Sequence, residues 1–173
     1  HPHVSEHIVV VHNGIIENYA VLKEGLKKHG FTFNSETDTE VLIQLIEYVK
    51  KSNNVDLTTA VQLALNQVVG AYAIAVIEKG KPDIIVAARK GSPLVVGIGE
   101  GEFFIASDAT PIVEYTNQVV YVGDEEIVTL ERAKEIKIKT ISNVEKTPEI
   151  KKLEMTLSQL EKGGFPHFMI KEI

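Results

Sequence analysis

The chain has 173 residues, which is enough for one substantial hydrophobic core. Its formal net charge of -6 argues against a nucleic-acid partner, because a duplex-binding surface needs clustered Lys and Arg to displace phosphate counterions. No apolar run approaches the ~20 residues of a membrane span. Without cysteine the chain can form neither disulfides nor thiolate metal sites, which is compatible with the cytoplasm, the location we predict.

The first expected element is a β-strand over His7–Val11, whose unbroken Ile-Val-Val-Val run is typical of a strand buried on both faces. We predict that this strand ends in a turn at Asn13-Gly14 and that the chain then enters a helix over Tyr19–Lys28. The alternative is a β-hairpin, which is the commonest meaning of an Asn-Gly dipeptide. The helical pattern after the turn favours the strand-turn-helix interpretation.

Two more helices are expected before the strand-rich part of the chain. Thr37 and Glu40 have the spacing of a capping box, which predicts a helix over Asp38–Lys51. Ser52-Asn53-Asn54 breaks this helix, and apolar residues at helical spacing predict a third helix over Asp56–Val68.

From Ala71 onward the apolar pattern changes to short β-rich runs separated by turns. Helices followed by strands predict an α+β fold with a largely antiparallel sheet. We expect one unit over residues 1–145 and a second over 146–173, in which Lys146–Lys162 is helix-prone and His167–Ile173 leads out of the domain. The expected strands are Ala71–Glu78, Ile84–Arg89, Leu94–Gly97, Phe103–Ala106, Gln118–Val122, Glu126–Leu130 and Ile136–Thr140.

Asn13 and Gly14 are the first candidate site residues. At the end of a strand, the Asn13 side-chain N–H and the Gly14 backbone N–H can be held as two fixed donors, and glycine permits close approach to a ligand. Two such donors stabilise an oxyanion in acyl transfer, where a single donor contributes roughly 3–4 kcal/mol. This interpretation competes with the simple turn described above.

Asp38 is the second candidate, and it has two compatible roles. An acid in the first turn of a helix complements the helix dipole, and the same carboxylate can pair with a substrate ammonium group. His1 and His3 occupy alternate positions near His7, so a metal pair is conceivable. We predict no metal, because no third ligand has a suitable spacing, and we expect His12 to be a packed, hydrogen-bonded histidine.

Several motifs spread over nearly the whole chain carry a family resemblance. They are His1-Pro2-His3-Val4-Ser5, His7-Ile8-Val9-Val10-Val11-His12-Asn13-Gly14-Ile15-Ile16-Glu17-Asn18, Ser35-Glu36-Thr37-Asp38-Thr39-Glu40, Gly70-Ala71-Tyr72, Ala88-Arg89-Lys90-Gly91-Ser92-Pro93-Leu94, Phe104-Ile105-Ala106-Ser107-Asp108 and Pro166-His167-Phe168-Met169-Ile170-Lys171-Glu172-Ile173. In these motifs the chain resembles the glutaminase domain of the glutamine–fructose-6-phosphate aminotransferases (isomerising), or glucosamine-6-phosphate synthases. The Asn-Gly pair alone is shared with other class II glutamine amidotransferases.

The resemblance implies an N-terminal-nucleophile hydrolase-like fold, a four-layer αββα sandwich with antiparallel sheets. Here the fold is expected to be missing its N-terminal strands, which would leave an exposed edge or a compensating contact. The resemblance also implies L-glutamine as substrate and no cofactor. Asn13 and Gly14 would be the oxyanion donors, Asp38 would bind the α-ammonium group of glutamine, and His1 would line the glutamine site.

The same resemblance implies that the released ammonia passes to a sugar-isomerase half of the same full-length chain. That half would aminate fructose 6-phosphate to glucosamine 6-phosphate, and we expect the full-length protein to be a homo-oligomer. Residues 1–145 would then be a partial glutaminase domain, and residues 146–173 a helix and linker toward the isomerase half.

Two segments of the family have no counterpart in this sequence: the N-terminal Cys-Gly-Ile-Val-Gly and the Arg-Trp-Ala-Thr-His-Gly loop. The family's cysteine is the nucleophile, with its own α-amino group as general base. We therefore expect a fragment that is inactive by itself. Two alternatives stay open: a non-catalytic ligand-binding or regulatory module of the same fold, and the glutaminase domain of another class II amidotransferase.

Overall fold

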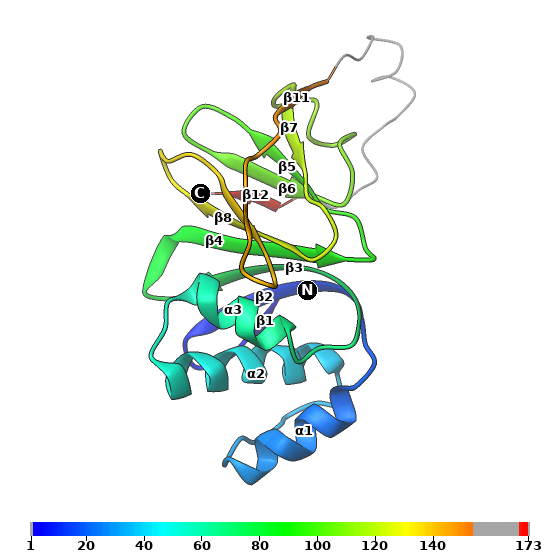
Figure 1. Ribbon diagram of the computed structural model, residues 1–173, viewed down its shortest axis with the longest axis vertical. Coiled ribbons are helices and arrows are strands. Elements are labelled where there is room, and N and C mark those ends of the chain that lie inside the picture. Colours follow the sequence, from blue (N-terminus) through cyan, green and yellow to red (C-terminus); the bar gives the residue numbers. More distant parts are fainter. Residues whose placement is uncertain (1, 154–169, 173) are drawn as a thin grey trace.

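The computed structural model describes residues 2–153 and 170–172 of the chain. Helices lie on one face of a seven-stranded sheet, and the other face of that sheet packs against a five-stranded sheet (Figure 1). Neighbouring strands in both sheets are antiparallel. The predicted α+β class with antiparallel sheets is confirmed.

The described helices all precede the strands of the second sheet, as the periodicity predicts. They are α1 (Tyr19–Lys28), α2 (Asp38–Asn53) and α3 (Leu57–Leu65). The seven-stranded sheet has the order β1 (His3–Val4), β2 (Ile8–Ile16), β3 (Gly70–Glu78), β4 (Lys81–Lys90), β8 (Glu126–Glu131), β9 (Lys137–Thr140) and β10 (Glu145–Lys146). The five-stranded sheet has the order β11 (Lys151–Lys152), β7 (Gln118–Tyr121), β5 (Val95–Ile98), β6 (Phe103–Ala106) and β12 (Ile170–Glu172).

The central strands of the seven-stranded sheet are buried on both faces. On β3, Tyr72 and Ile74 point toward the helices and are 1% exposed, while Ala73 and Ala75 pack against the five-stranded sheet. This alternation follows from the two-residue period of a strand. On β2 the expected burial of both faces holds only on the helix side, because the residues facing the other way, Val9 and Val11, stay half-buried.

Helix α2 begins where the capping pattern predicts, but the capping box is only half formed. Thr37 Oγ1 accepts the Glu40 N–H at 3.4 Å, as an N-cap should. The Glu40 carboxylate does not return to the N-cap. It reaches further back and accepts the N–H groups of Asn34 and Ser35, both at 2.7 Å, so that it also fixes the turn before the helix.

The end of the chain differs from the expected helix and outgoing connection. Lys151–Lys152 forms β11, which pairs with β7, and Ile170–Glu172 forms β12, which pairs with the outer edge of β6. The helical composition of this region is overridden by pairing with the second sheet. The remainder of the expected helix, within residues 154–169, lies outside the described residues.

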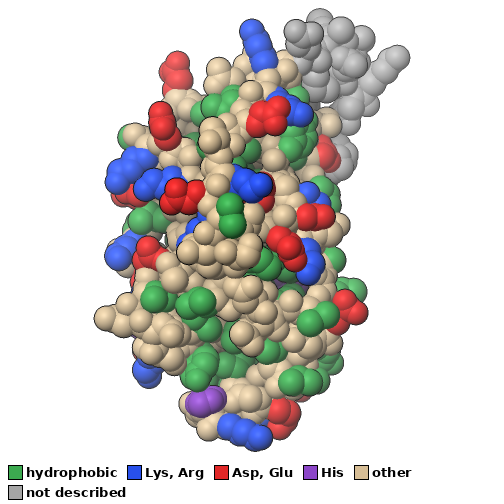
Figure 2. Space-filling view, viewed as in Figure 1, with side chains coloured by type: hydrophobic (Ala, Val, Ile, Leu, Met, Phe, Trp, Pro, Cys, Tyr) green, Lys and Arg blue, Asp and Glu red, His purple; other side chains and the backbone are tan. Residues whose placement is uncertain are grey.

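The surface carries charges of both signs. On the face shown in Figure 2, Lys and Arg side chains alternate with Asp and Glu side chains, and hydrophobic side chains gather in the lower half, where the helices lie. None of the helices described here is both long and apolar enough to cross a membrane.

Glu47 on α2 stabilises the tight loop between β1 and β2 through hydrogen bonds. Its side chain is 10% exposed and accepts hydrogen bonds from Ser5 Oγ at 2.6 Å and from the His7 backbone N–H at 2.7 Å. His7 Nδ1 lies 3.1 Å from its second oxygen. Burial alone would raise the pKa of Glu47, but these hydrogen bonds outweigh burial and lower the pKa below its ordinary value.

Replacing Glu47 with Gln is expected to lower the free energy of unfolding by about 1–3 kcal/mol at pH 7, because charge-assisted hydrogen bonds are lost at a buried site. The stabilisation by the carboxylate is fully present above the ordinary glutamate pKa of 4.5 and is lost as the pH falls through the lowered folded-state pKa. The gap between wild type and variant should therefore narrow below pH 4.5.

Urea denaturation at several pH values measures this gap. Glu36→Gln is the matched control, since the Glu36 side chain is 96% exposed and its ion pair with Lys23 spans 3.5 Å. We expect that control to change stability by less than about 0.5 kcal/mol at any pH. A Glu47→Gln variant as stable as wild type at pH 7 would contradict the stabilising role.

Candidate functional site

Asn13 and Gly14 lie inside strand β2 and not at its end. The strand continues to Ile16, and Asn13 is paired with Ala73 and Gly14 with Tyr72 on β3. Both the predicted turn and the alternative hairpin are therefore wrong. The signal that suggested a turn is real, because Gly14 has a φ of 118°, but the chain uses it within a paired strand.

Only glycine fits at position 14, because of a close contact as well as the backbone angle. A Cβ atom at this position would lie 2.2 Å from the Ala71 carbonyl oxygen on the neighbouring strand. Gly70, at the start of β3, is constrained in the same way. Its φ is 138°, and a Cβ atom there would lie 2.1 Å from the Ile15 carbonyl oxygen. The two glycines with positive φ therefore lie where β2 and β3 pair, next to the exposed Asn13.

Asn13 lines a cavity of about 260 Å³ at one end of the space between the two sheets. Pro93 and Leu94 border it where the chain enters β5, and Ala106 and Ser107 border it where the chain leaves β6. The side chain of Asn13 is on the same face of the seven-stranded sheet as Ala73, which packs toward the second sheet. A side-chain amide that is exposed beside a cavity can donate a hydrogen bond to a ligand oxygen.

Asp38 is the first residue of α2 and contacts β2 at Ile16, beyond Asn13 along that strand. Its Oδ2 accepts the backbone N–H of Ile16 at 2.8 Å, and the residue is half-buried. This bond ties the first turn of the helix to the end of the strand, so the structural role expected for an acid at this position is present. Asp38 does not border the cavity that Asn13 lines.

His12 links the same two elements one residue before Asn13. Its Nδ1 lies 2.9 Å from Thr39 Oγ1 on α2, which agrees with the expected packed and hydrogen-bonded histidine. Burial lowers the pKa of His12, partly opposed by the charge of Asp38, so the ring is neutral at pH 7. His12 Nε2 and His3 Nδ1 are buried and have no hydrogen-bond partner among the described residues.

His3 and His7, both near the start of the chain, do not lie at one point. His3 lies on β1 opposite Val10, whereas His7 contacts Glu47 at the other end of that hairpin. The described residues contain no group of three or more His, Cys, Asp or Glu arranged to hold a metal ion. His1, expected to line a substrate site, lies outside the described residues.

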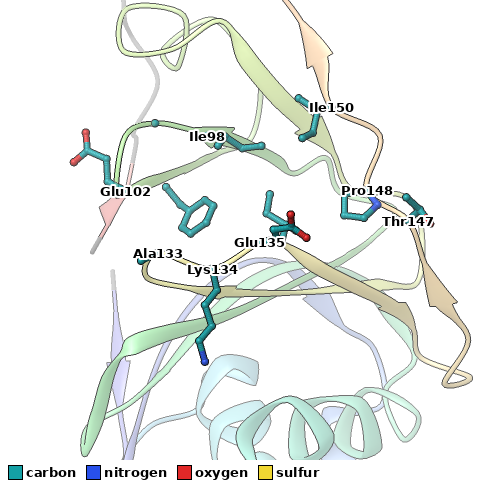
Figure 3. Close-up of a pocket in the computed structure, with 12 residues that line it drawn as sticks. Ile98, Glu102, Ala133, Lys134, Glu135, Thr147, Pro148 and Ile150 are labelled. Carbon is teal, nitrogen blue, oxygen red and sulfur yellow. The ribbon is translucent and has the colours of Figure 1, made fainter.

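A second cavity, of about 470 Å³, opens between the sheets where β5 and β6 turn (Figure 3). Ile98, Ile136 and Pro148 give it an apolar lining, and Lys134 and Glu135 border it. It lies at the far ends of β5 and β6 from Asn13, because Val95 pairs with Ala106 at one end and Ile98 pairs with Phe103 at the other. The larger cavity therefore does not contain the candidate site residues.

The cavity around Asn13 was only partly foreseeable. Asn13 could be singled out because a short polar residue followed a strongly apolar strand. In the sequence, Pro93 and Ser107 stand just outside the expected strands Leu94–Gly97 and Phe103–Ala106, and only the packing of the second sheet brings them opposite β2.

This fold and this site define a class of protein. The sequence matches the family model of the glutamine amidotransferase domain over residues 1–114, and the chain belongs to this family. Two solved structures share the fold: a glutamine phosphoribosylpyrophosphate amidotransferase from B. subtilis complexed with ADP and GMP, and an allosteric regulatory enzyme of purine biosynthesis. The first has a TM-score of 0.65 and 24% identity over 80% of this chain and 30% of its own. The second has a TM-score of 0.66 and 25% identity over 82% of this chain and 30% of its own.

Curated relatives narrow the comparison. A glutamine–fructose-6-phosphate aminotransferase (isomerising) of Bacteroides thetaiotaomicron is 67% identical over 100% of this chain, and one of Chlorobaculum tepidum is 53% identical over 100%. The chain spans 28% of the length of each of these two relatives.

The predicted N-terminal-nucleophile hydrolase-like sandwich is confirmed by the solved structures that share the fold. Among the described residues, helices cover only the seven-stranded sheet, and a turn-rich segment around Ile112 packs on the outer face of the five-stranded sheet against Phe104.

Proposed function

We propose that this chain is the glutamine-hydrolysing part of a glutamine–fructose-6-phosphate aminotransferase and that it supplies ammonia for glucosamine 6-phosphate synthesis. The observation that carries the proposal is Asn13, an exposed amide within strand β2 that lines a cavity between two antiparallel sheets. The proposal is supported by the family match and by relatives with this activity that align over the whole chain.

In this proposal Asn13 and Gly14 stabilise the oxyanion. A cysteine thiolate attacks the side-chain amide carbon of L-glutamine, and the carbonyl oxygen takes the negative charge. The Asn13 amide and the Gly14 N–H donate to that oxygen. The cysteine α-amino group, which takes the thiol proton, returns that proton to the leaving nitrogen so that ammonia departs, and water then hydrolyses the thioester to glutamate. The 173 residues contain no cysteine. In this proposal the cysteine nucleophile is therefore supplied by the rest of a full-length protein, and the segment alone is predicted to be inactive.

Asp38 supplies the charge that selects an amino acid. Its Oδ2 is held by the Ile16 N–H, and we propose that the remaining oxygen pairs with the α-ammonium group of glutamine. Several points remain predictions: that His1 lines the same site, that a sugar-isomerase half is the partner, that the full-length protein is a homo-oligomer, and that its location is cytoplasmic.

The test is glutamine turnover by the full-length protein, with Asp38→Asn as the informative variant. Asn keeps an oxygen for the Ile16 N–H and removes the charge, so we expect the KM for glutamine to rise about 10- to 100-fold with a smaller change in kcat. The control is Asp83→Asn, a 68% exposed carboxylate on β4 paired with Arg132, which should leave both constants unchanged.

Absence of glutamine hydrolysis in the wild-type protein would overturn the proposal and favour a non-catalytic module of the same fold. Hydrolysis without amination of fructose 6-phosphate would point to another class II amidotransferase.

A further inference from the structure

The Arg89 side chain joins two loops: the loop between β4 and β5 and the loop between β7 and β8. Neither loop has a role in the mechanism proposed above. It is 21% exposed, and each of its guanidinium nitrogens has a partner. Nε donates to the Ser92 carbonyl at 2.8 Å, Nη1 donates to the Val122 carbonyl at 3.0 Å, and Nη2 lies 2.8 Å from Asp124 Oδ1. A planar guanidinium reaching three acceptors in fixed directions is a rigid fastening that a lysine ammonium cannot reproduce.

Asp124 closes the arrangement from the other side. The same Oδ1 that pairs with Arg89 also accepts the backbone N–H of Gly91 at 2.9 Å. The Val122 N–H donates to the Leu94 carbonyl at 3.1 Å, which adds a backbone link between the two loops. The loop between β4 and β5 is therefore tied at Gly91, Ser92 and Leu94.

This loop forms one wall of the cavity that Asn13 lines. Pro93 and Leu94 border the cavity directly. Gly91 has a φ of 76° and approaches Ala71 so closely that a Cβ would lie 2.9 Å from the Ala71 Cβ. The Ala71 carbonyl is the group that excludes a side chain at Gly14. A displacement of the loop would therefore reach both the wall of the cavity and the strand next to the proposed oxyanion donors.

We propose that Arg89 and Asp124 are a positioning pair for the glutamine site, an inference that rests on the proposed function. They touch no reacting atom. They set the place of Pro93 and Leu94 against Asn13, and so they determine how well the cavity fits its substrate.

The experiment compares Arg89→Lys and Asp124→Asn with wild type in the full-length protein. Both variants should raise the KM for glutamine roughly tenfold and change kcat by less than about twofold, because the wall contacts substrate and transition state alike. Asp124 has a 64% exposed side chain, so its variant is expected to fold even where the arginine variant does not. Lys90→Gln is the control, since Lys90 is the neighbouring residue and its ion pair with Glu125 is exposed.

A second readout does not depend on activity. In the 173-residue chain, amide exchange at Gly91 should accelerate at least about tenfold in Asp124→Asn, with little change at core amides of β3. If wild type hydrolyses glutamine and both variants keep its KM, the positioning role is overturned while the proposed function stands. If wild type hydrolyses no glutamine, the proposed function fails and the role assigned to this pair fails with it.

Discussion

Replacing Asn13 with Ala in the full-length protein is expected to lower kcat for glutamine hydrolysis by roughly 10²–10³-fold. The carbonyl oxygen of glutamine is neutral when the substrate binds and becomes negative only as the thiolate attacks. A donor fixed beside that oxygen therefore stabilises the transition state more than the bound substrate. For the same reason the KM should change little, which separates Asn13 from Asp38 and from the Arg89–Asp124 pair.

Steady-state release of glutamate measures this effect. Asn117→Ala is the matched control, because Asn117 is an exposed asparagine in the turn before β7, at the end of the sandwich away from the candidate cavity. That variant should retain the wild-type kcat. Since the Asn13 side chain is itself exposed, its removal should also leave the free energy of unfolding within about 1 kcal/mol of wild type. A stable Asn13→Ala protein with undiminished turnover would remove Asn13 from the oxyanion site.

The helices could be predicted closely because their signals are local. Helix α2 starts at the predicted Asp38, and the predicted third helix begins at Asp56, which proves to be its N-cap. Capping residues and a period of 3.6 act over a few neighbouring positions, so a sequence window contains most of the information.

The sheets could be predicted only as a set of strands. The order within the seven-stranded sheet places β8 beside β4, and the strands between them in sequence belong to the other sheet. Such pairing is decided by packing between distant residues. The same limit explains the error at the C-terminal end, where Lys151–Lys152 is polar and helix-prone but pairs with β7.

The site shows a different limit. Asn13 and Asp38 were identified from motif and resemblance, and the structure places one beside a cavity and the other against the end of the same strand. The expected turn was wrong because the Asn-Gly signal for a turn takes account only of neighbouring residues in the sequence. Here the constraint on Gly14 comes from Ala71 on the next strand, a contact that no local pattern contains.

That contact makes Gly14→Ala the substitution with the largest expected effect on stability. An alanine at Gly14 must either hold a φ near 118° or move the strand, and its Cβ would lie 2.2 Å from the Ala71 carbonyl oxygen, on backbone that cannot rotate away. Strain and overpacking together should reduce the free energy of unfolding by about 3–5 kcal/mol. Urea denaturation of the 173-residue chain measures this without any need for activity.

Gly25→Ala is the control for glycine replacement itself. Gly25 lies within helix α1, its φ is not positive, and a Cβ there would have nothing within 4 Å. Alanine has the higher helix propensity, so this variant should be as stable as wild type or up to about 1 kcal/mol more stable. Equal effects at the two positions would mean that β2 and β3 do not approach each other at Gly14 as described, and the shape of the proposed oxyanion site would have to be abandoned with that contact.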